Sequence, residues 1–284
     1  MADIFEVGIV GSGIMGAGLA EVVARAGHDV VVRSRTTEGA EAVLAAIRAG
    51  LDRQVAKERM TGAESEAIVA RVRATDHLGQ LANCDLVIES VVEDLEVKKA
   101  LFAELEQIVK PGGILATNTS TLPVVELAMA TQRPELVCGI HFFNPAPVMK
   151  LVEIVRPVTV SAQTIERAVA FAERCGKDAV TVEDRAGFVV NALLFPYLNN
   201  AIRLCESGTA SMESIDVAMQ GGCGFPMGPF ALLDLVGLDT SLAILDALYT
   251  EFKDPNYAAM PLLRRKVAAG QLGRKSGQGF YSYG

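Results

Sequence analysis

The sequence predicts an α/β fold: a doubly wound, mainly parallel sheet followed by a smaller all-helical domain. Short apolar runs typical of strands alternate with helical patterns as far as Asp184. A glycine-rich turn joins the first of these strands to the first helix. After Asp184 the helical patterns continue almost without strand-like runs. We therefore expect two domains, residues 1–185 and residues 186–284.

The strands of the first domain are predicted from their short, Val- and Ile-rich runs. They are expected at Val7–Val10, Asp29–Arg33, Asp85–Glu89, Ile114–Thr117, Val137–Ile140, Leu151–Val155 and Ala179–Val182. Residues 37–75 form an insertion with two helix-like stretches that break near Thr61 and Gly62. The insertion is locally basic in an acidic chain, with Arg48, Arg53, Lys57 and Arg59.

The second domain is predicted to be a bundle of apolar helices. The helices are expected at Phe188–Ser207, Met212–Gln220, Phe230–Phe252 and Pro261–Ala269, with one late strand candidate at Phe280–Tyr281. Phe188–Phe195 and Phe230–Val236 are more apolar than a solvated surface requires. Either they form the core of a compact bundle or they pack against a second copy of the chain. The second explanation predicts a homodimer that associates through the helical domain.

The glycine-rich turn has the Rossmann spacing in its proper context, with a strand before it and a helix and second strand after it. Its residues are Gly11, Ser12, Gly13, Ile14, Met15 and Gly16. Gly11 permits the tight turn, Gly13 lets the backbone approach a pyrophosphate, and Gly16 lets the helix pack on the strand. The helix N-terminus then favours the phosphates. This pattern predicts a nicotinamide dinucleotide, NADP or NAD.

Ser34 stands where this fold usually has an acid, at the end of the second strand. A carboxylate about 20 residues after the turn would bind the free 2′-hydroxyl of NAD. Here a hydroxyl lies between Arg33 and Arg35, which suits a 2′-phosphate better. The sequence therefore favours NADP over NAD, with Ser34 and Arg35 at the ribose. Because side chains alternate along a strand, Arg33 and Arg35 are not expected to face the ribose together.

Composition limits the classes of partner and compartment. The net charge of −8 argues against nucleic acid as a partner. Five cysteines without a CxxC pair and only three histidines predict no metal site. No apolar run reaches the ~18 residues of a membrane span. The first strand begins near residue 5, so no targeting peptide is expected and the protein is predicted to be cytoplasmic.

His141 and Glu153 are the main candidates for acid–base chemistry. His141 follows the strand Val137–Ile140, at the strand ends where open α/β sheets bind ligands. Glu153 is the only acid among the apolar residues of the next strand. Its carboxylate could hold one ring nitrogen while the other faces substrate. The alternatives are a structural histidine and a partly exposed acid at a strand end.

Ser120 and Asn191 are candidate substrate contacts. Ser120 lies just after the strand Ile114–Thr117, at the same edge of the sheet, although Ser120 or Thr121 could simply cap a helix. Asn191 interrupts an apolar helix, and a buried amide must be hydrogen-bonded. It is therefore either a structural bridge or a substrate contact.

Seven segments, in order along the whole chain, resemble the 3-hydroxyacyl-CoA dehydrogenase family, most closely its short bacterial 3-hydroxybutyryl-CoA dehydrogenases. They are GSGIMGAG (Gly11–Gly18), VIESVVEDLEVKK (Val87–Lys99), NTSTL (Asn118–Leu122), HFFNPAPVMKLVEI (His141–Ile154), GFVVNALLFPYLNNAI (Gly187–Ile202), FPMGPFALLDLVGLD (Phe225–Asp239) and GRKSGQGFY (Gly273–Tyr281). The histidine segment with its downstream glutamate is the most specific of them.

The resemblance implies a role for each matching residue. His141 would be the general base, Glu153 its orienting partner, and Ser120 and Asn191 the contacts to the reacting oxygens of an acyl-CoA substrate. The implied cofactor contacts are Glu93, Lys98, Asn118, Asn144 and Lys275, and Lys57 would contact coenzyme A. The sequence departs from the family at Gly50, where some members have a serine contact, and at Ser34, where many have aspartate.

Three functions remain open from the sequence. The first is interconversion of a short-chain 3-hydroxyacyl-CoA and its 3-oxoacyl-CoA with NADP or NAD. The second is the same chemistry on a group carried by an acyl carrier protein, for which the basic stretch from Arg48 to Arg59 would be the docking face. The third is a dinucleotide-binding relative without catalysis, and the intact candidate residues argue against it.

Overall fold

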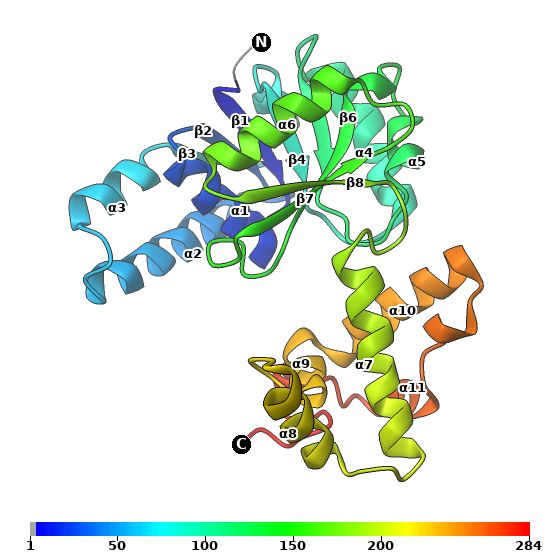
Figure 1. Ribbon diagram of the computed structural model, residues 1–284. Helices are drawn as coiled ribbons and strands as arrows, with labels where there is room; N and C mark the ends of the chain where they lie inside the picture. Colours follow the sequence, from blue (N-terminus) through cyan, green and yellow to red (C-terminus); the bar gives the residue numbers. More distant parts are fainter. Residues whose placement is uncertain (1–3) are drawn as a thin grey trace. The chain divides into compact units, whose positions relative to one another are not determined.

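The computed structural model describes residues 4–284. The chain forms two compact units, Met1–Asp184 and Arg185–Gly284. Figure 1 shows that the strands lie in the first unit and that the second is built of helices. The predicted fold class, a doubly wound sheet with a smaller helical domain, is confirmed.

Among the described residues, one eight-stranded sheet organises the first unit. Its strands are β1 (Glu6–Val10), β2 (Asp29–Arg33), β3 (Val72–Thr75), β4 (Leu86–Glu89), β5 (Ile114–Thr117), β6 (Val137–Phe142), β7 (Leu151–Arg156) and β8 (Asp178–Glu183). The order is β3-β2-β1-β4-β5-β6-β7-β8, and of these pairs only β6 and β7 are antiparallel. The order reverses direction between β1 and β4, so a ligand crevice is expected at their carboxyl ends.

Helices cover both faces of this sheet. They are α1 (Ile14–Arg25), α2 (Thr37–Ala56), α3 (Gly62–Val69), α4 (Leu95–Ile108), α5 (Val124–Ala128) and α6 (Ala162–Arg174). A buried core joins α1, α2 and α6 to the strands, while α4 and α5 pack beside β5 and β6 (Figure 1). Because the central strands are covered on both faces, most residues of β1, β4 and β5 are apolar and buried.

The insertion contains one element that the sequence analysis missed. Its two helices, α2 and α3, are separated at residues 57–61, where the break was predicted. Residues 72–75 then form β3, the edge strand beside β2. An edge strand is partly solvated, and β3 carries Arg73 and Thr75 among only four residues. It therefore lacks the apolar run that identified the other strands.

The second unit contains five helices among its residues. They are α7 (Val190–Glu206), α8 (Met212–Cys223), α9 (Pro229–Val236), α10 (Leu238–Phe252) and α11 (Pro261–Ala268). The single helix predicted over Phe230–Phe252 is wrong, because Gly237, at φ 102°, separates α9 from α10. The strand candidate at Phe280–Tyr281 is also wrong. Its two backbone N–H groups donate instead to the buried carboxylate of Asp234, which fixes the tail on α9.

In residues 4–284, no helix is both long enough and apolar enough to cross a membrane.

Candidate active site

A pocket of about 430 Å³ opens at the point where the strand order reverses, between the ends of β1 and β4. It is lined by Val10, Gly11, Ser12, Gly13, Arg33, Ser34, Arg35, Ser90, Val91, Val92, Val97 and Leu101. The sequence analysis identified its glycine-rich and basic sides. It missed the wall made by Ser90–Val92 and the first turns of α4, which follows β4.

The glycines of the turn make contacts that a side chain would prevent. Gly11 has a φ of 131°, and a Cβ on it would lie 2.2 Å from the carbonyl oxygen of Ser90. A Cβ on Gly16 would lie 2.0 Å from the carbonyl oxygen of Gly11. In contrast, a Cβ on Gly13 would meet no protein atom within 4 Å. The turn is thus closely packed against the protein at Gly11 and Gly16 and open at Gly13, at the N-terminus of α1. This arrangement fits a bound dinucleotide pyrophosphate.

Ser34 is buried at the far side of this pocket, with 4% exposure. Its hydroxyl donates to Ser12 Oγ over 3.0 Å, and so links the ribose side of the pocket to the glycine-rich turn. A Cβ on Gly39, in the first turn of α2, would lie 2.2 Å from Ser34 Oγ. The side chain of Ser34 is therefore confined between the glycine-rich turn and the first turn of α2.

Both arginines line the pocket, and the expectation that only one of them faces the ribose stays a prediction. Strand β2 ends at Arg33, and the chain bends at Arg35 and Thr36, so strand alternation does not extend to Arg35. Arg33 Nε donates to the carbonyl of Asp76 over 3.4 Å. The pKa of Asp76 lies below its usual range, chiefly because the Thr37 hydroxyl donates to its carboxylate. The Asp76 carboxylate offsets part of the positive charge of Arg33. Arg35 is exposed to solvent.

His141 and Glu153 lie directly opposite each other on the antiparallel strands β6 and β7. Side chains opposite each other on such strands share one face of the sheet. Both are buried, with 4% and 1% exposure, and His141 Nδ1 lies 2.8 Å from Glu153 Oε2. His141 belongs to β6, which continues to Phe142, two residues beyond its predicted end. The carboxylate thus orients the ring with its Nε2 directed away from Glu153.

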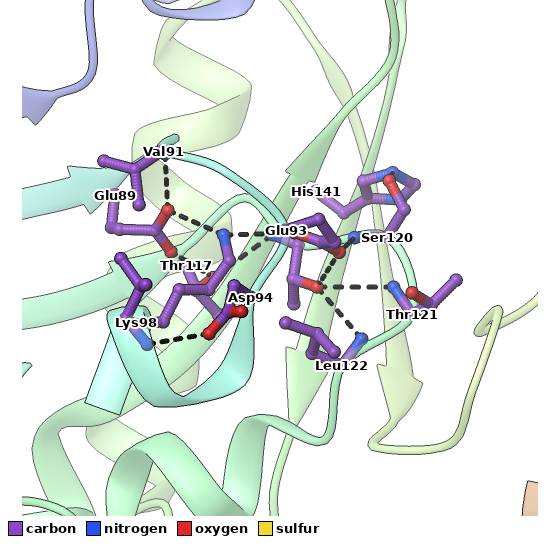
Figure 2. Close-up of polar contacts among 12 residues, drawn as sticks. Glu89, Val91, Glu93, Asp94, Lys98, Thr117, Ser120, Thr121, Leu122 and His141 are labelled. Carbon is purple, nitrogen blue, oxygen red and sulfur yellow. Dashed lines mark hydrogen bonds and ion pairs between the residues drawn. The ribbon is translucent and has the colours of Figure 1, made fainter. Parts of the chain in front are cut away.

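Ser120 lies on the other side of the histidine ring. Its Oγ is 3.1 Å from His141 Nε2, as the close-up in Figure 2 illustrates. The capping alternative for Ser120 and Thr121 does not hold. The N-terminus of α5 is capped instead by Asp184, whose two carboxylate oxygens accept the N–H groups of Val124 and Val125 over 2.9 and 2.7 Å.

Glu93 and Lys98 belong to a polar cluster beside Ser120 (Figure 2). Lys98 Nζ lies 3.1 Å from Glu93 Oε2, and Glu93 Oε1 accepts the N–H of Ser120 over 3.0 Å. Asn118 lies at the same edge, where its Oδ1 accepts the N–H of Phe142 over 2.8 Å. Asn118 therefore joins the carboxyl ends of β5 and β6.

The four remaining predicted residues belong to other elements of the chain. Asn144 is exposed in the loop after β6, and Lys57 is exposed at the C-terminal cap of α2. Asn191 is buried in the first turn of α7, in the helical unit, and Lys275 of the same unit pairs with Asp239 over 2.6 Å. The roles implied for these four residues stay predictions.

The sequence analysis missed Glu89, Thr117 and Thr119, which are buried beside the predicted residues. The available signal was an acid at the end of a fully apolar strand, with Lys98 one helical turn into the next element. Burial raises the pKa of the Cys138 thiol on β6 to about 12, so this cysteine is not a thiolate nucleophile at neutral pH. Within residues 4–284, no cluster of three or more His, Cys, Asp or Glu side chains could hold a metal ion.

Comparisons with known proteins match the whole chain. Residues 6–185 match the NAD-binding domain of 3-hydroxyacyl-CoA dehydrogenase, and residues 187–283 match the C-terminal domain of the same family. A 3-hydroxybutyryl-CoA dehydrogenase of Mycobacterium tuberculosis is 48% identical over 290 residues, which covers 100% of both chains.

Two solved structures extend this similarity to the fold. The crystal structure of M. tuberculosis FadB2 has a TM-score of 0.98 and 46% identity, and the alignment covers 100% of both chains. That of an (S)-3-hydroxybutyryl-CoA dehydrogenase from Ralstonia eutropha has a TM-score of 0.96 and 41% identity, over 99% of this chain and 100% of the other. The first unit is thus a nicotinamide-dinucleotide-binding domain, and the chain belongs to the 3-hydroxyacyl-CoA dehydrogenase family.

Proposed function

We propose that this protein interconverts a short-chain 3-hydroxyacyl-CoA and its 3-oxoacyl-CoA, with 3-hydroxybutyryl-CoA and acetoacetyl-CoA as the reference pair. The relatives named for this reaction match the chain from end to end. The observation that carries the proposal is the contact series Ser120–His141–Glu153, with donor–acceptor distances of 3.1 and 2.8 Å. A family member without catalysis would have no need to keep this series.

In the proposed mechanism His141 is the general base. The pKa of a secondary alcohol lies far above neutrality, so its proton must leave as the C–H bond breaks. His141 Nε2 receives the 3-hydroxyl proton, while Glu153 holds Nδ1 and stabilises the charge that develops on the ring. Ser120 Oγ, beside Nε2, hydrogen-bonds the reacting oxygen. A bound nicotinamide cofactor would supply the hydride acceptor for the oxidation and the hydride donor for the reduction.

Asn191, at the start of α7, is proposed as a second contact to the substrate oxygens. Glu93, Lys98, Asn118, Asn144 and Lys275 are proposed as cofactor contacts.

The proposed cofactor is NADP, with NAD as the weaker alternative. Ser34 replaces an acid that would repel a 2′-phosphate, and two guanidinium groups line the same pocket. Arg35 is the stronger candidate for the phosphate contact, because Asp76 offsets part of the charge of Arg33. Charge-assisted hydrogen bonds of this type are about twice as strong as neutral ones.

The proposed acyl carrier is coenzyme A. The alternative, an acyl carrier protein, would need a basic docking face on α2 and α3. The positive charge of that face is reduced, because Arg48 Nη1 lies 4.0 Å from Glu66 Oε1. Lys57 remains exposed and is the proposed contact to coenzyme A.

The carrier is tested by comparing kcat/KM for acetoacetyl-CoA and for an acetoacetyl group on an acyl carrier protein, from the absorbance of the reduced nicotinamide. We expect acetoacetyl-CoA to be the better substrate by at least about tenfold, which corresponds to ~1.4 kcal/mol in transition-state binding. A higher kcat/KM for the carrier-linked group would support the alternative.

The helical unit is proposed to bind substrate and to form a homodimer. Its exposed apolar side chains support this, among them Leu193 at 72%, Val217 at 69% and Leu235 at 50% exposure. Light scattering at micromolar concentration is expected to give the mass of a dimer, or of a multiple of dimers. The mass of a 30.1 kDa monomer would refute this proposal.

A further inference from the structure

A buried ion pair joins Glu89 to Lys98, and Glu89 has no part in the proposed function above. The side chain of Glu89 is 0% exposed at the end of β4, and that of Lys98 is 1% exposed in the first turn of α4. Lys98 Nζ lies 2.6 Å from Glu89 Oε1. Removing two charges from water costs several kcal/mol per ion. A pair kept at that cost needs good geometry and further hydrogen bonds.

Glu89 has those hydrogen bonds. Its Oε1 also accepts the N–H of Val91 over 2.6 Å, and its Oε2 accepts the Thr117 hydroxyl over 2.7 Å. The carboxylate thus joins three elements: the turn after β4 that lines the cofactor pocket, the end of β5, and α4. Figure 2 shows these contacts on one side of Glu93 and the Ser120 loop on the other.

Lys98 also forms an ion pair with Glu93. Its ammonium is shared between the buried Glu89 and the half-exposed Glu93, at 2.6 and 3.1 Å. Glu93 uses its other oxygen, Oε1, to accept the Thr119 hydroxyl and the N–H of Ser120. Thr119 Oγ1 in turn accepts the N–H of Leu122 over 3.0 Å, which closes the turn around Ser120.

We infer that Glu89 is a positioning residue: through Lys98 and Glu93 it sets the place of Ser120 against His141. The inference rests on the proposed function, because it assigns Ser120 a role in that reaction. The hydrogen bonds of Glu89 go to Lys98, Val91 and Thr117, and its side chain is closed to solvent. The effect passes through charge. When residue 89 is neutral, Lys98 is balanced by Glu93 alone and draws that carboxylate away from the N–H of Ser120.

The test is a double-mutant cycle of Glu89→Gln with Ser120→Ala, measured as kcat at saturating acetoacetyl-CoA and reduced cofactor. Glu89→Gln alone is expected to lower kcat about tenfold, since misplacement by about 1 Å can cost about a hundredfold. In the Ser120→Ala background the same change is expected to lower kcat less than about twofold, because the group it positions is already absent. Equal losses in both backgrounds would overturn the inference.

The matched control is Asp85→Asn. Asp85 joins the same two elements at their other ends: it precedes β4 and lies 2.6 Å from Lys110, which follows α4. Its carboxylate also accepts the N–H groups of Phe5 and Glu6. Asp85→Asn is expected to lower the melting temperature but to leave kcat within about twofold, as for a substitution that changes stability alone. A tenfold loss of kcat in this variant would show that any weakening of the contact between β4 and α4 is sufficient to lower kcat, and would contradict a specific role for Glu89.

Hydrogen exchange keeps the inference testable without turnover. Exchange of the amides of residues 119–122 is expected to be about tenfold faster in Glu89→Gln than in the wild type, and unchanged in Asp85→Asn. If the wild type fails to reduce acetoacetyl-CoA, the proposed function fails, and this exchange alone decides whether Glu89 positions the Ser120 turn. Unchanged exchange would overturn it.

If Glu89→Gln does not fold, Glu89→Gln with Lys98→Met removes both charges together, which buried pairs often tolerate. In this double variant Glu93 loses Lys98 as its partner, so the amides of residues 119–122 are still expected to exchange faster than in the wild type. Unchanged exchange in the double variant would overturn the inference.

Discussion

His141→Gln is expected to lower kcat by about 10²–10⁴-fold, the usual contribution of general acid–base catalysis. Glutamine can occupy the space between Ser120 and Glu153, but its amide does not accept a proton at neutral pH. Cofactor affinity is expected to stay nearly unchanged, because His141 does not line the dinucleotide pocket. Steady-state kinetics with acetoacetyl-CoA and fluorescence titration with the reduced cofactor measure the two quantities separately.

Glu153→Gln is the control for this substitution. It keeps the size of the side chain 2.8 Å from His141 Nδ1 but removes its charge, so substrate affinity should change little while kcat falls severely. A His141→Gln enzyme that retains more than about a tenth of wild-type kcat would exclude His141 as the base. Normal kcat in Glu153→Gln would mean that the pair is structural.

Ser34→Asp is expected to reverse the cofactor preference from NADPH to NADH. A carboxylate at this position would accept a hydrogen bond from the free 2′-hydroxyl of NADH and repel the 2′-phosphate of NADPH. A charge-assisted hydrogen bond to the 2′-phosphate contributes roughly 1.5–3 kcal/mol to binding, or about ten- to a hundredfold in affinity. The measurement is kcat/KM for both cofactors with the wild type and the variant, at one fixed acetoacetyl-CoA concentration.

The arginine variants separate the two basic side chains of the pocket. Arg35→Ala is expected to weaken NADPH binding and to leave NADH binding unchanged. Arg33→Ala is expected to do the same to a smaller extent, since Arg33 lines the pocket but shares its surroundings with Asp76. If neither variant alters the ratio of NADPH to NADH affinity, both side chains are simply solvated charges.

The dinucleotide half of the site could be predicted from the sequence because the residues that form it are close together in the chain. The spacing of Gly11, Gly13 and Gly16 specifies the turn itself, and the strand before it and helix after it are continuous apolar patterns. The His141–Glu153 contact depends on one further fact, the antiparallel register of β6 and β7. An acid and a histidine on consecutive strands suggested the contact, but periodicity alone does not fix that register.

What the sequence analysis missed depends on where strands end and on burial. Strand β2 ends at Arg33 and the chain bends at Arg35 and Thr36, so both arginines line the pocket, which strand alternation alone did not predict. The backbone of Gly237 divides a helical pattern that has no break in its apolar residues. The sequence places Glu89 at the end of an apolar strand and Lys98 in the next helix, but it does not show that the two side chains are buried against each other. The role of Glu89 is visible only once Lys98, Thr117 and Val91 lie around it.

The most direct test of the whole account is a matched titration of the wild-type protein with NADPH and NADH, with acetoacetyl-CoA as the acceptor. We predict that acetoacetyl-CoA is reduced with both cofactors and that kcat/KM is at least about tenfold higher for NADPH, the lower end expected for one charge-assisted bond to the 2′-phosphate. Binding of either cofactor without any reduction of acetoacetyl-CoA would contradict the proposed function, and equal kcat/KM values or a preference for NADH would contradict the role assigned to Ser34 and Arg35.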